Sequence, residues 1–389
     1  MDNPYVIVIA NGLNGLGAVR SASVAGLRTY TLLTNQTDLS AFSRFAQYRF
    51  LLPASPTLED VRPLLDQLRE NEGGPGVLLA CSDLGAELLG QLKSEGYDRH
   101  HLIVPDSRTT DILNDKKLEC EAMEKGGITL PATCYDLASD DFHHFPMIIK
   151  PRTFREYQVL GAKNRIVDSP DELDAFRKEF PRQLDRFIGQ EVIEGADANL
   201  WVCNVTFDRN QELATCFVFN RLGTMPSHYG VTSLAISRAN EALVEECRKI
   251  GKALGYTGPA MIEFKKDANS DRYFYIETNP RLGMCNWFDT RCGVNNILAS
   301  ARVAYGEDAH VAPQKNNRVY WNFFGDLIAR LEDRERLFSI LVLYLGLLRY
   351  QRVGALLYWR DLRPAMRYSW TSLRDLLRRT RRKLSERLS

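Results

Sequence analysis

The sequence predicts an α/β domain, then an α+β region, then a helical C-terminal extension. Apolar runs alternate with helical patterns over residues 1–105, whereas residues 106–310 lack that regular alternation. Residues 310–389 differ again, because they hold 17 Lys and Arg against 7 Asp and Glu. With 389 residues, 44% of them hydrophobic, the chain can bury a sizeable core without disulfides.

The first region has the order strand, Gly-rich turn, helix, strand. Residues 5–10 (YVIVIA) and 28–34 (RTYTLLT) are strand candidates, and a helical pattern covers residues 18–27. The later elements expected here are helices at 57–71 and 83–96 and short strands at 77–81 and 101–105. We therefore expect residues 1–105 to form a small doubly wound domain.

The Gly-rich turn at residues 11–17 (NGLNGLG) has two interpretations. Gly12, Gly15 and Gly17 could bring the backbone close to a phosphate at a helix N-terminus. However, their spacing is GxxGxG instead of GxGxxG, and no acidic residue for a ribose ends the strand at 28–34. The turn therefore supports an NAD-type oxidoreductase only weakly, and a tight turn that touches substrate explains it as well.

The middle region should contain strands, turns and a few helices. The expected strands cover residues 145–151, 161–167, 188–195, 200–207, 213–219, 258–266 and 272–280, and the expected helices cover 111–127, 169–180 and 239–255. Ser169 and Glu172 have the spacing of a capping box at the start of the second of these helices.

Two lysines in this region suggest a phosphate site. Lys116 lies in the turn LNDKK, and Lys150 ends the apolar strand FPMIIKP. A lysine at the end of a buried strand needs a partner, because an unpaired ammonium group there is costly. Each lysine alone could be a solvated surface residue, but their order along the chain is harder to obtain by chance.

Two glutamates suggest a metal site. Glu263 and Glu277 lie on neighbouring strand candidates joined by the turn at residues 267–272, and Asn279 shares a strand face with Glu277. These oxygen donors suit Mg²⁺, and buried carboxylates that repel one another favour a bound cation. The alternative is an exposed hairpin whose glutamates form ordinary salt bridges.

These ordered motifs resemble the ATP-grasp superfamily of carboxylate-amine and carboxylate-thiol ligases over residues 1–310. The more distant similarity is to D-aspartate ligases, biotin carboxylases and D-alanine ligases. The resemblance implies a Rossmann-like pre-ATP-grasp domain at 1–105, an ATP-grasp domain at 106–310 and a C-terminal region at 311–389. The ATP-grasp domain would divide into a small lobe at about 106–195 and a large lobe at about 196–310.

The resemblance also implies a role for each site residue, with ATP and Mg²⁺ as cofactors. Lys116, Lys150 and Lys163 would contact phosphates, the backbone of Glu191, Val192 and Ile193 would pair with adenine, and Asp197 would hold the ribose. Glu263, Glu277 and Asn279 would bind Mg²⁺, and Arg281 and Arg221 would lie near the acyl phosphate. The implied reaction activates a carboxylate as an acyl phosphate and passes it to an amine, with ADP and phosphate as products.

One segment departs from the family pattern. The phosphate-covering loop is usually rich in glycine, but here it reads PRTFREYQVLG, so Arg152, Arg155 or Lys163 would have to replace backbone contacts. A nucleotide-binding module without turnover is therefore an alternative to the ligase. Downstream, residues 281–293 could line the acceptor pocket, although Trp287 and Phe288 could equally be core aromatics.

The remaining features concern location and partners. The eight cysteines have neither CxxC pairs nor zinc-ligand spacing, which favours reduced, buried thiols. The N-terminus does not resemble a secretory signal, so a cytoplasmic location is expected. The apolar run at 337–348 is too short to span a bilayer, but the basic tail could lie on the inner face of a membrane. Packing on the protein body or on a second subunit, as a homodimer, is the alternative. No nucleic-acid recognition motif is present.

Overall fold

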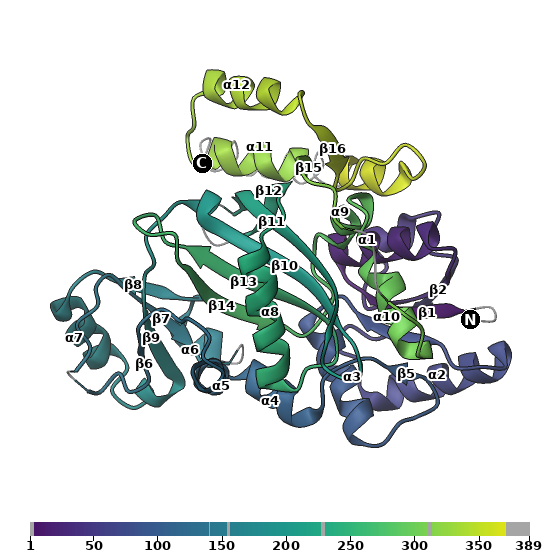
Figure 1. Ribbon diagram of the computed structural model, residues 1–389, viewed down its shortest axis with the longest axis horizontal. Helices are drawn as coiled ribbons and strands as arrows, with labels where there is room; N and C mark the ends of the chain where they lie inside the picture. The colour runs from purple at the N-terminus through teal and green to yellow at the C-terminus, as the bar shows by residue number, and fades with distance from the viewer. Residues whose placement is uncertain (1–3, 140, 154–155, 227–229, 310–312, 371–389) are drawn as a thin grey trace, which may run out of the picture.

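The computed structural model describes residues 4–139, 141–153, 156–226, 230–309 and 313–370. These residues form three β-sheets, each with helices packed against it (Figure 1). The fold class is therefore mixed α/β, as the sequence predicts.

The first sheet is parallel and has the strand order β3-β2-β1-β4-β5. Its strands are β1 (Tyr5–Ala10), β2 (Arg28–Leu33), β3 (Tyr48–Leu51), β4 (Val77–Ala80) and β5 (His101–Leu102). The associated helices are α1 (Gly12–Val24), η1 (Leu39–Phe42), α2 (Leu58–Glu72) and α3 (Asp83–Ser94). The two faces of β1 contribute to two separate cores, as expected for a strand inside a doubly wound sheet. One of these cores also contains side chains of α10 (Asn296–Tyr305), from much later in the chain.

The second sheet is antiparallel and has the order β6-β9-β7-β8. Its strands are β6 (Thr133–Cys134), β7 (Met147–Pro151), β8 (Arg165–Val167) and β9 (Phe187–Glu191). The helices of this region are α4 (Ser107–Asn114), α5 (Lys116–Lys125), α6 (Tyr157–Leu160), α7 (Pro170–Glu179) and η3 (Leu184–Arg186).

Two local predictions for this region were wrong. The single helix expected at 111–127 is two helices, because the Asp115 side chain accepts hydrogen bonds from the N–H groups of Lys117 and Leu118 and starts a new helix. Ser169 does cap α7, but Glu172 Oε2 accepts from the N–H of Asp168 at 2.9 Å instead of completing the capping box with Ser169.

The third sheet has the order β14-β13-β10-β11-β12-β15-β16 and is antiparallel except for β15 and β16. Its first five strands in chain order are β10 (Leu200–Phe207), β11 (Leu213–Met225), β12 (Val231–Ser237), β13 (Gly258–Lys266) and β14 (Tyr273–Asn279). The remaining elements here are η4 (Asp197–Asn199), α8 (Glu241–Leu254) and α9 (Asn286–Arg291). Side chains of α8 pack against one face, and side chains of α9 pack against the other.

The C-terminal region adds strands as well as helices, which corrects the expectation of a purely helical extension. β15 (Arg318–Trp321) and β16 (Gln351–Gly354) complete the third sheet, while α11 (Phe323–Glu332) and α12 (Leu337–Leu347) lie outside it, along one edge of the molecule (Figure 1). The arginine-rich segment 371–389 lies outside the described residues. In the described residues no helix combines the length and apolar character needed to cross a bilayer.

The cysteines are free thiols, and all except Cys216 are buried, as expected. Three of them come together although their spacing gave no sign of it. Cys203, Cys216 and Cys247, from β10, β11 and α8, place their sulfur atoms within 4.8 Å of one another. They lie in the core between the sheet and α8.

Candidate active site

A cavity of about 890 Å³ is lined by residues of the second and third sheets and by the segments that follow β1 and β4 of the first sheet. The twelve residues to which the resemblance assigns a role all contribute to it, although they span positions 116 to 281. They are Lys116, Lys150, Lys163, Glu191, Val192, Ile193, Asp197, Arg221, Glu263, Glu277, Asn279 and Arg281. Residues far apart in sequence therefore converge on one cavity.

The acidic pair occupies directly opposed positions on the β13–β14 hairpin. Glu263 is paired with Glu277 in the strand register, and a register irregularity follows Glu263. Asn279 donates from Nδ2 to Glu277 Oε1 at 3.1 Å. Two carboxylates and an amide oxygen thus lie on adjacent strands, a donor set that fits Mg²⁺.

Each carboxylate of the pair has one cationic neighbour. Arg221, on β11, donates to Glu263 Oε1 at 2.6 Å and to Thr232 Oγ1 at 2.8 Å, and both members of this ion pair are about nine-tenths buried. Lys116, at the start of α5, lies 3.1 Å from Glu277 Oε2. The charge of Lys116 lowers the pKa of Glu277 to about 2, against an opposing effect of burial. The charge of Lys116 therefore favours the ionised form of Glu277, the form that a metal ion requires.

The two lysines lie close enough to affect one another. Burial acts to lower the pKa of Lys116, but the charges of Glu277 and Glu119 outweigh it and raise the pKa. Lys150, at the end of β7, donates to Gln190 Oε1 at 2.7 Å, and burial followed by repulsion from Lys116 lowers its pKa. Among the residues that the structure describes, Lys150 thus has a neutral hydrogen-bond acceptor and no carboxylate in contact with it, which favours binding of an anion.

Glu119 supports this arrangement and was missed by the sequence analysis. It is 2% exposed, and its Oε1 accepts from Tyr275 Oη at 2.6 Å and from the N–H of Thr278 at 2.8 Å. Burial raises its pKa. Because Glu119 ties α5 to β14, it fixes Lys116 relative to Glu277. Its sequence context, within a helix that has an exposed face, gave no signal of this contact.

The segment after β9 presents a backbone edge to the cavity. The N–H groups of Glu191 and Val192 donate to the carbonyls of Ala132 and Pro146, both at 2.9 Å. Within the described part of the chain, the N–H of Ile193 has no hydrogen-bond partner. Such a backbone edge can pair with a base by accepting through one carbonyl and donating through an N–H group.

Asp197 lies beyond this edge, in η4. Its Oδ2 accepts from Thr224 Oγ1 at 2.8 Å, so the carboxylate is anchored from β11. Lys265 Nζ contacts the carbonyls of Gly195 and Ala196 at 2.5 and 2.9 Å, which fixes the preceding turn.

The loop between β7 and β8 supplies side chains to the cavity instead of a Gly-rich backbone. Lys163 and Tyr157 line it, whereas Arg152 is engaged in an ion pair with Asp115 and does not. Arg155 lies outside the described residues. Among the cationic candidates of this loop that the structure describes, Lys163 is therefore the one available to a ligand in the cavity.

Arg281 connects the cavity to the first sheet. Its Nε donates to Asp83 Oδ1 at 2.6 Å, at the start of α3, and its Nη2 donates to Asn279 Oδ1 at 3.2 Å. Met284 and Cys285, just after it, line the cavity. Trp287 and Phe288 are 3% and 0% exposed and do not line it, so they are core aromatics.

The Gly-rich turn also borders the cavity, through residues 11–14. Two of its glycines allow close packing: a Cβ on Gly15 would lie 2.7 Å from that of Ala10, and a Cβ on Gly17 would collide with Asn286 Oδ1. Asn14 donates to the carbonyls of Cys81 and Leu282 at 2.9 and 2.7 Å. These contacts account for the glycines by packing and place the turn beside the site.

Comparisons with known proteins bear on the fold that carries this cavity. Residues 232–311, which include the β13–β14 hairpin, match the family model of the ATP-binding domain of the carbamoyl-phosphate synthase L chain. No curated protein matches the chain in sequence.

Several solved structures match most of the chain. N5-carboxyaminoimidazole synthetase from Staphylococcus aureus has 13% identity and a TM-score of 0.59 over 79% of each chain. L-amino acid ligase from Bacillus licheniformis has 15% identity and a TM-score of 0.56, over 80% of this chain and 78% of that one. The biotin carboxylase domain of Hydrogenobacter thermophilus 2-oxoglutarate carboxylase, solved with MgADP, ADP and bicarbonate, has 16% identity and a TM-score of 0.59, over 81% and 73%. At such identities the similarity is one of fold.

Proposed function

Because the chain has the fold of the ATP-grasp superfamily, we propose that it is an ATP-dependent ligase that joins a carboxylic acid to an amine. The observation that carries the proposal is the opposition of two lysines to two carboxylates in one cavity. Lys116 and Lys150 face the Glu263–Glu277 pair there, and a backbone edge ends β9 beside them. Lysines suit phosphates, carboxylates suit a divalent cation, and a backbone edge suits a nucleotide base. Together these groups suit a complex of a nucleotide with a divalent cation.

The nucleotide would extend from the segment after β9 to the two lysines. Adenine would pair with the backbone between Glu191 and Ile193, and the Asp197 carboxylate would accept hydrogen bonds from ribose hydroxyls. Lys150 and Lys116 would contact phosphate oxygens, with Lys163 approaching from the loop. A phosphate would give Lys150 the anionic partner that it lacks here, and would raise its lowered pKa.

Glu263, Glu277 and Asn279 would hold Mg²⁺. When bound, Mg²⁺ neutralises part of the charge on the phosphates. The chain's own contribution is to keep Glu277 ionised through Lys116, to pair Glu263 with Arg221, and to fix the separation of the two carboxylates on paired strands. The structure of a biotin carboxylase domain with MgADP supports this combination of fold and ligand.

The reaction we propose has two steps. A carboxylate oxygen of the acid attacks the γ-phosphorus of ATP, the bond to the bridging oxygen breaks, and ADP leaves. The amine then attacks the acyl carbon, inorganic phosphate leaves, and the nitrogen loses a proton. Arg281 and Arg221 would stabilise the negative charge of the acyl phosphate, since both guanidinium groups line the cavity beside the acidic pair.

Product analysis tests this proposal. The purified protein is incubated with MgATP and pools of carboxylic acids and amines, and nucleotides and phosphate are quantified. We expect ADP and phosphate, formed only when both an acid and an amine are present. Release of AMP and pyrophosphate would mean adenylation and would refute the proposal. Tight MgATP binding without product in any pool would favour the module without turnover.

A further inference from the structure

The C-terminal region presents an unusually apolar surface. In α12 only Ile340 and Leu347 are buried, and the side chains that face outward are large and apolar. Leu337, Phe338, Leu341, Val342, Leu345 and Leu348 are between 51% and 76% exposed. The other side of the helix packs on the third sheet through Leu343, Tyr344 and Leu347. A contiguous row of this kind usually marks an interaction surface.

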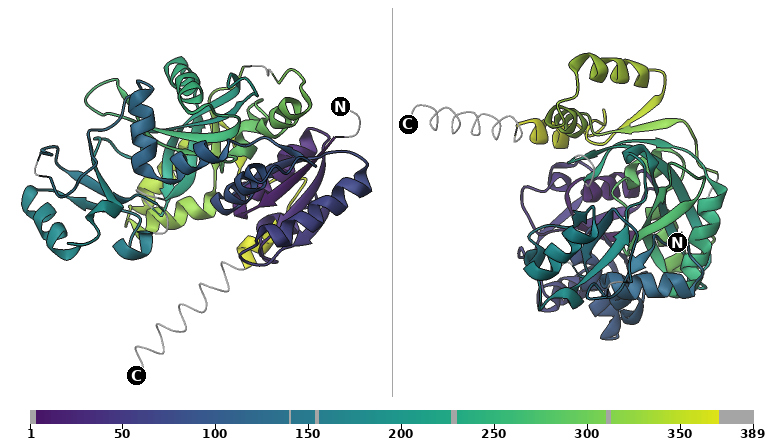
Figure 2. Two further views of the ribbon diagram at one scale, coloured as in Figure 1. Left: turned by 90° about the horizontal axis from the view of Figure 1, so that it is seen from below. Right: turned by 90° about the vertical axis from the view of Figure 1, so that its left-hand side faces the viewer.

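The segment after β16 also exposes large apolar side chains. Trp359 is 79% exposed, Met366 is 69% exposed and Trp370 is 63% exposed. Figure 2 shows the C-terminal elements as a layer outside the three-sheet body. Tryptophan side chains are favoured where apolar and aqueous phases meet, because the indole has both an apolar body and an N–H donor.

From residue 336 to residue 370 the exposed charges have one sign, whereas the preceding α11 segment also exposes the carboxylates of Glu332 and Asp333. Between residues 336 and 370 the basic residues are Arg336, Arg349, Arg352, Arg360, Arg363 and Arg367, and the single carboxylate is Asp361. Asp361 is 2% exposed and is neutralised by Arg20, whose Nε lies 2.9 Å from its Oδ2. The surface charge of this segment is therefore positive.

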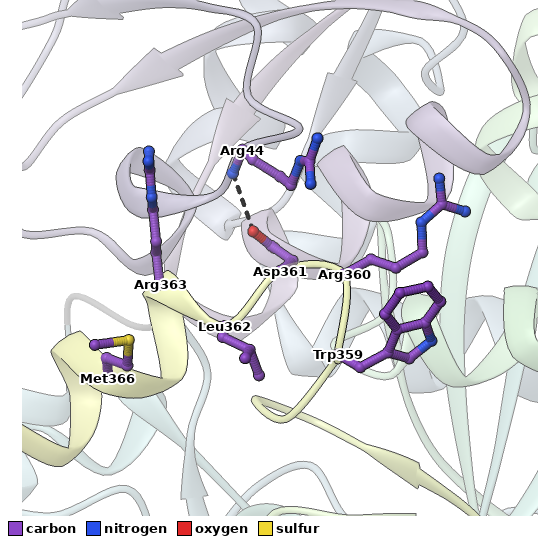
Figure 3. Close-up of a pocket in the computed structure, with 7 residues that line it drawn as sticks. All are labelled: Arg44, Trp359, Arg360, Asp361, Leu362, Arg363 and Met366. Atoms are coloured by element: carbon purple, nitrogen blue, oxygen red, sulfur yellow. Dashed lines mark hydrogen bonds between the residues drawn. The ribbon is translucent and has the colours of Figure 1, made fainter.

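Three arginines surround a second cavity, of about 580 Å³, in this layer. Arg44, Arg360 and Arg363 line it together with Trp359, Leu362 and Met366 (Figure 3). The Asp361 carboxylate accepts from the backbone N–H of Arg44 at 3.0 Å and fixes the segment against the first domain. All three arginines are exposed, so the cavity combines guanidinium donors with apolar walls. This combination fits a phosphate-bearing headgroup attached to an acyl chain.

We propose that this layer docks on an anionic phospholipid membrane. The exposed face of α12, with Trp359, Met366 and Trp370, would enter the interfacial region, and the Arg44–Arg360–Arg363 cavity would take lipid phosphate. A second copy of the chain fits less well, because a two-fold contact would bring the same positive surfaces together without exposed carboxylates between residues 336 and 370. This inference does not depend on the proposed reaction.

Vesicle co-sedimentation of the full chain tests the proposal. The vesicles contain either phosphatidylcholine alone or phosphatidylcholine with one-quarter phosphatidylglycerol. We expect binding to the anionic vesicles that weakens as salt is raised. Phe338→Ser with Leu345→Ser should abolish it, and Arg360→Glu with Arg363→Glu should lower the partition coefficient by on the order of 10²-fold or more.

Matched controls separate this surface from general effects. Lys178→Glu with Arg182→Glu changes the net charge by the same amount as Arg360→Glu with Arg363→Glu, but at exposed positions near the second sheet. This control should bind vesicles much more strongly than the Arg360→Glu with Arg363→Glu variant. Val24→Ser with Leu51→Ser removes apolar side chains that are 56% and 52% exposed elsewhere, and should change nothing. Absence of binding to both vesicle types would overturn the proposal. So would a dimer in gel filtration that Phe338→Ser with Leu345→Ser converts to monomer without any vesicle binding.

Discussion

Replacing Glu277 by Gln should remove catalysis while leaving the protein folded. The change keeps the shape of the side chain but removes the charge that faces Lys116 at 3.1 Å. The fall of the Glu277 pKa from its ordinary 4.5 to about 2 would correspond to about 3 kcal/mol in a site sealed from water. The side chain is 35% exposed, however, and solvent screening reduces this to about 1 kcal/mol.

The sign of this contribution sets the assay conditions. Because the pKa is lowered in the folded state, the stabilisation is fully present above pH 4.5 and is lost as the pH falls through about 2. Unfolding by urea at about pH 7.5 therefore measures all of it. We expect a loss of about 1 kcal/mol or less, since the substitution also removes repulsion from Glu263 across the hairpin.

The effect on function should be much larger. Loss of a charged ligand from the metal site should lower turnover on the order of 10²-fold or more. Calorimetry of ADP binding with and without Mg²⁺ gives a second measurement that does not require the substrates, and the gain in affinity due to Mg²⁺ should be lost. Glu212→Gln is the matched control, since it breaks a Glu–Lys pair of 3.4 Å on the surface. If Glu277→Gln keeps both turnover and the Mg²⁺ effect within about twofold of the control, the assignment of the metal site is wrong.

Three further predictions concern other charged groups. Lys150→Ala should reduce turnover on the order of 10²-fold. In the wild type, ATP affinity should fall as the pH rises through the lowered pKa of Lys150. Binding should then be accompanied by proton uptake, which calorimetry in two buffers measures. Lys150→Arg should lack this pH dependence. Arg221→Met should lower the free energy of unfolding in urea by about 3 kcal/mol, because it leaves Glu263 buried and unpaired. Adding Glu263→Gln should restore part of this loss. Equal stability of the single and double variants would contradict this reasoning. Arg20→Met should likewise lower the free energy of unfolding by about 3 kcal/mol or more, because it leaves the fully buried Asp361 without its cation. An unchanged urea midpoint would show that the pair contributes nothing to stability.

The parts of the site that the sequence revealed are those with short-range signals. Lys150 ends an apolar strand, and Glu263 and Glu277 lie on two strands joined by one turn, so neighbouring residues determine their placement. A hairpin brings its strands together whatever the rest of the fold does. The acidic pair and Lys150 could therefore be placed from local sequence patterns alone.

The supporting contacts could not be found in this way. Glu119 reaches Thr278 across 159 residues, and Arg221 reaches Glu263 across 42. Whether a charged residue is buried depends on which elements pack over it, and local sequence does not encode that. The same limit explains why Arg152, a reasonable candidate for contacting phosphate, is instead engaged with Asp115.

Strand β12 was missed for a related reason. Its sequence VTSLAIS contains hydroxyl side chains that suggest a loop, yet all but its first residue are buried. Ser233 donates to Asp326 Oδ1 at 2.9 Å, and Ser237 donates to the carbonyl of Lys315 at 2.9 Å. Distant partners thus satisfy polar groups that, judged locally, would disfavour a buried strand.

The Arg20–Asp361 pair has a consequence for the order in which the chain can fold. Arg20 is 0% exposed, and its guanidinium also donates to the carbonyls of Ala355 and Leu356 at 3.0 Å each. During synthesis Arg20 emerges from the ribosome more than 300 residues before these acceptors do. Until then α1 carries a cation that must stay hydrated, so its final packing cannot precede the synthesis of residues 355–361. The packing of α1 therefore depends on a distant segment, although the sheet beside it is built from local sequence.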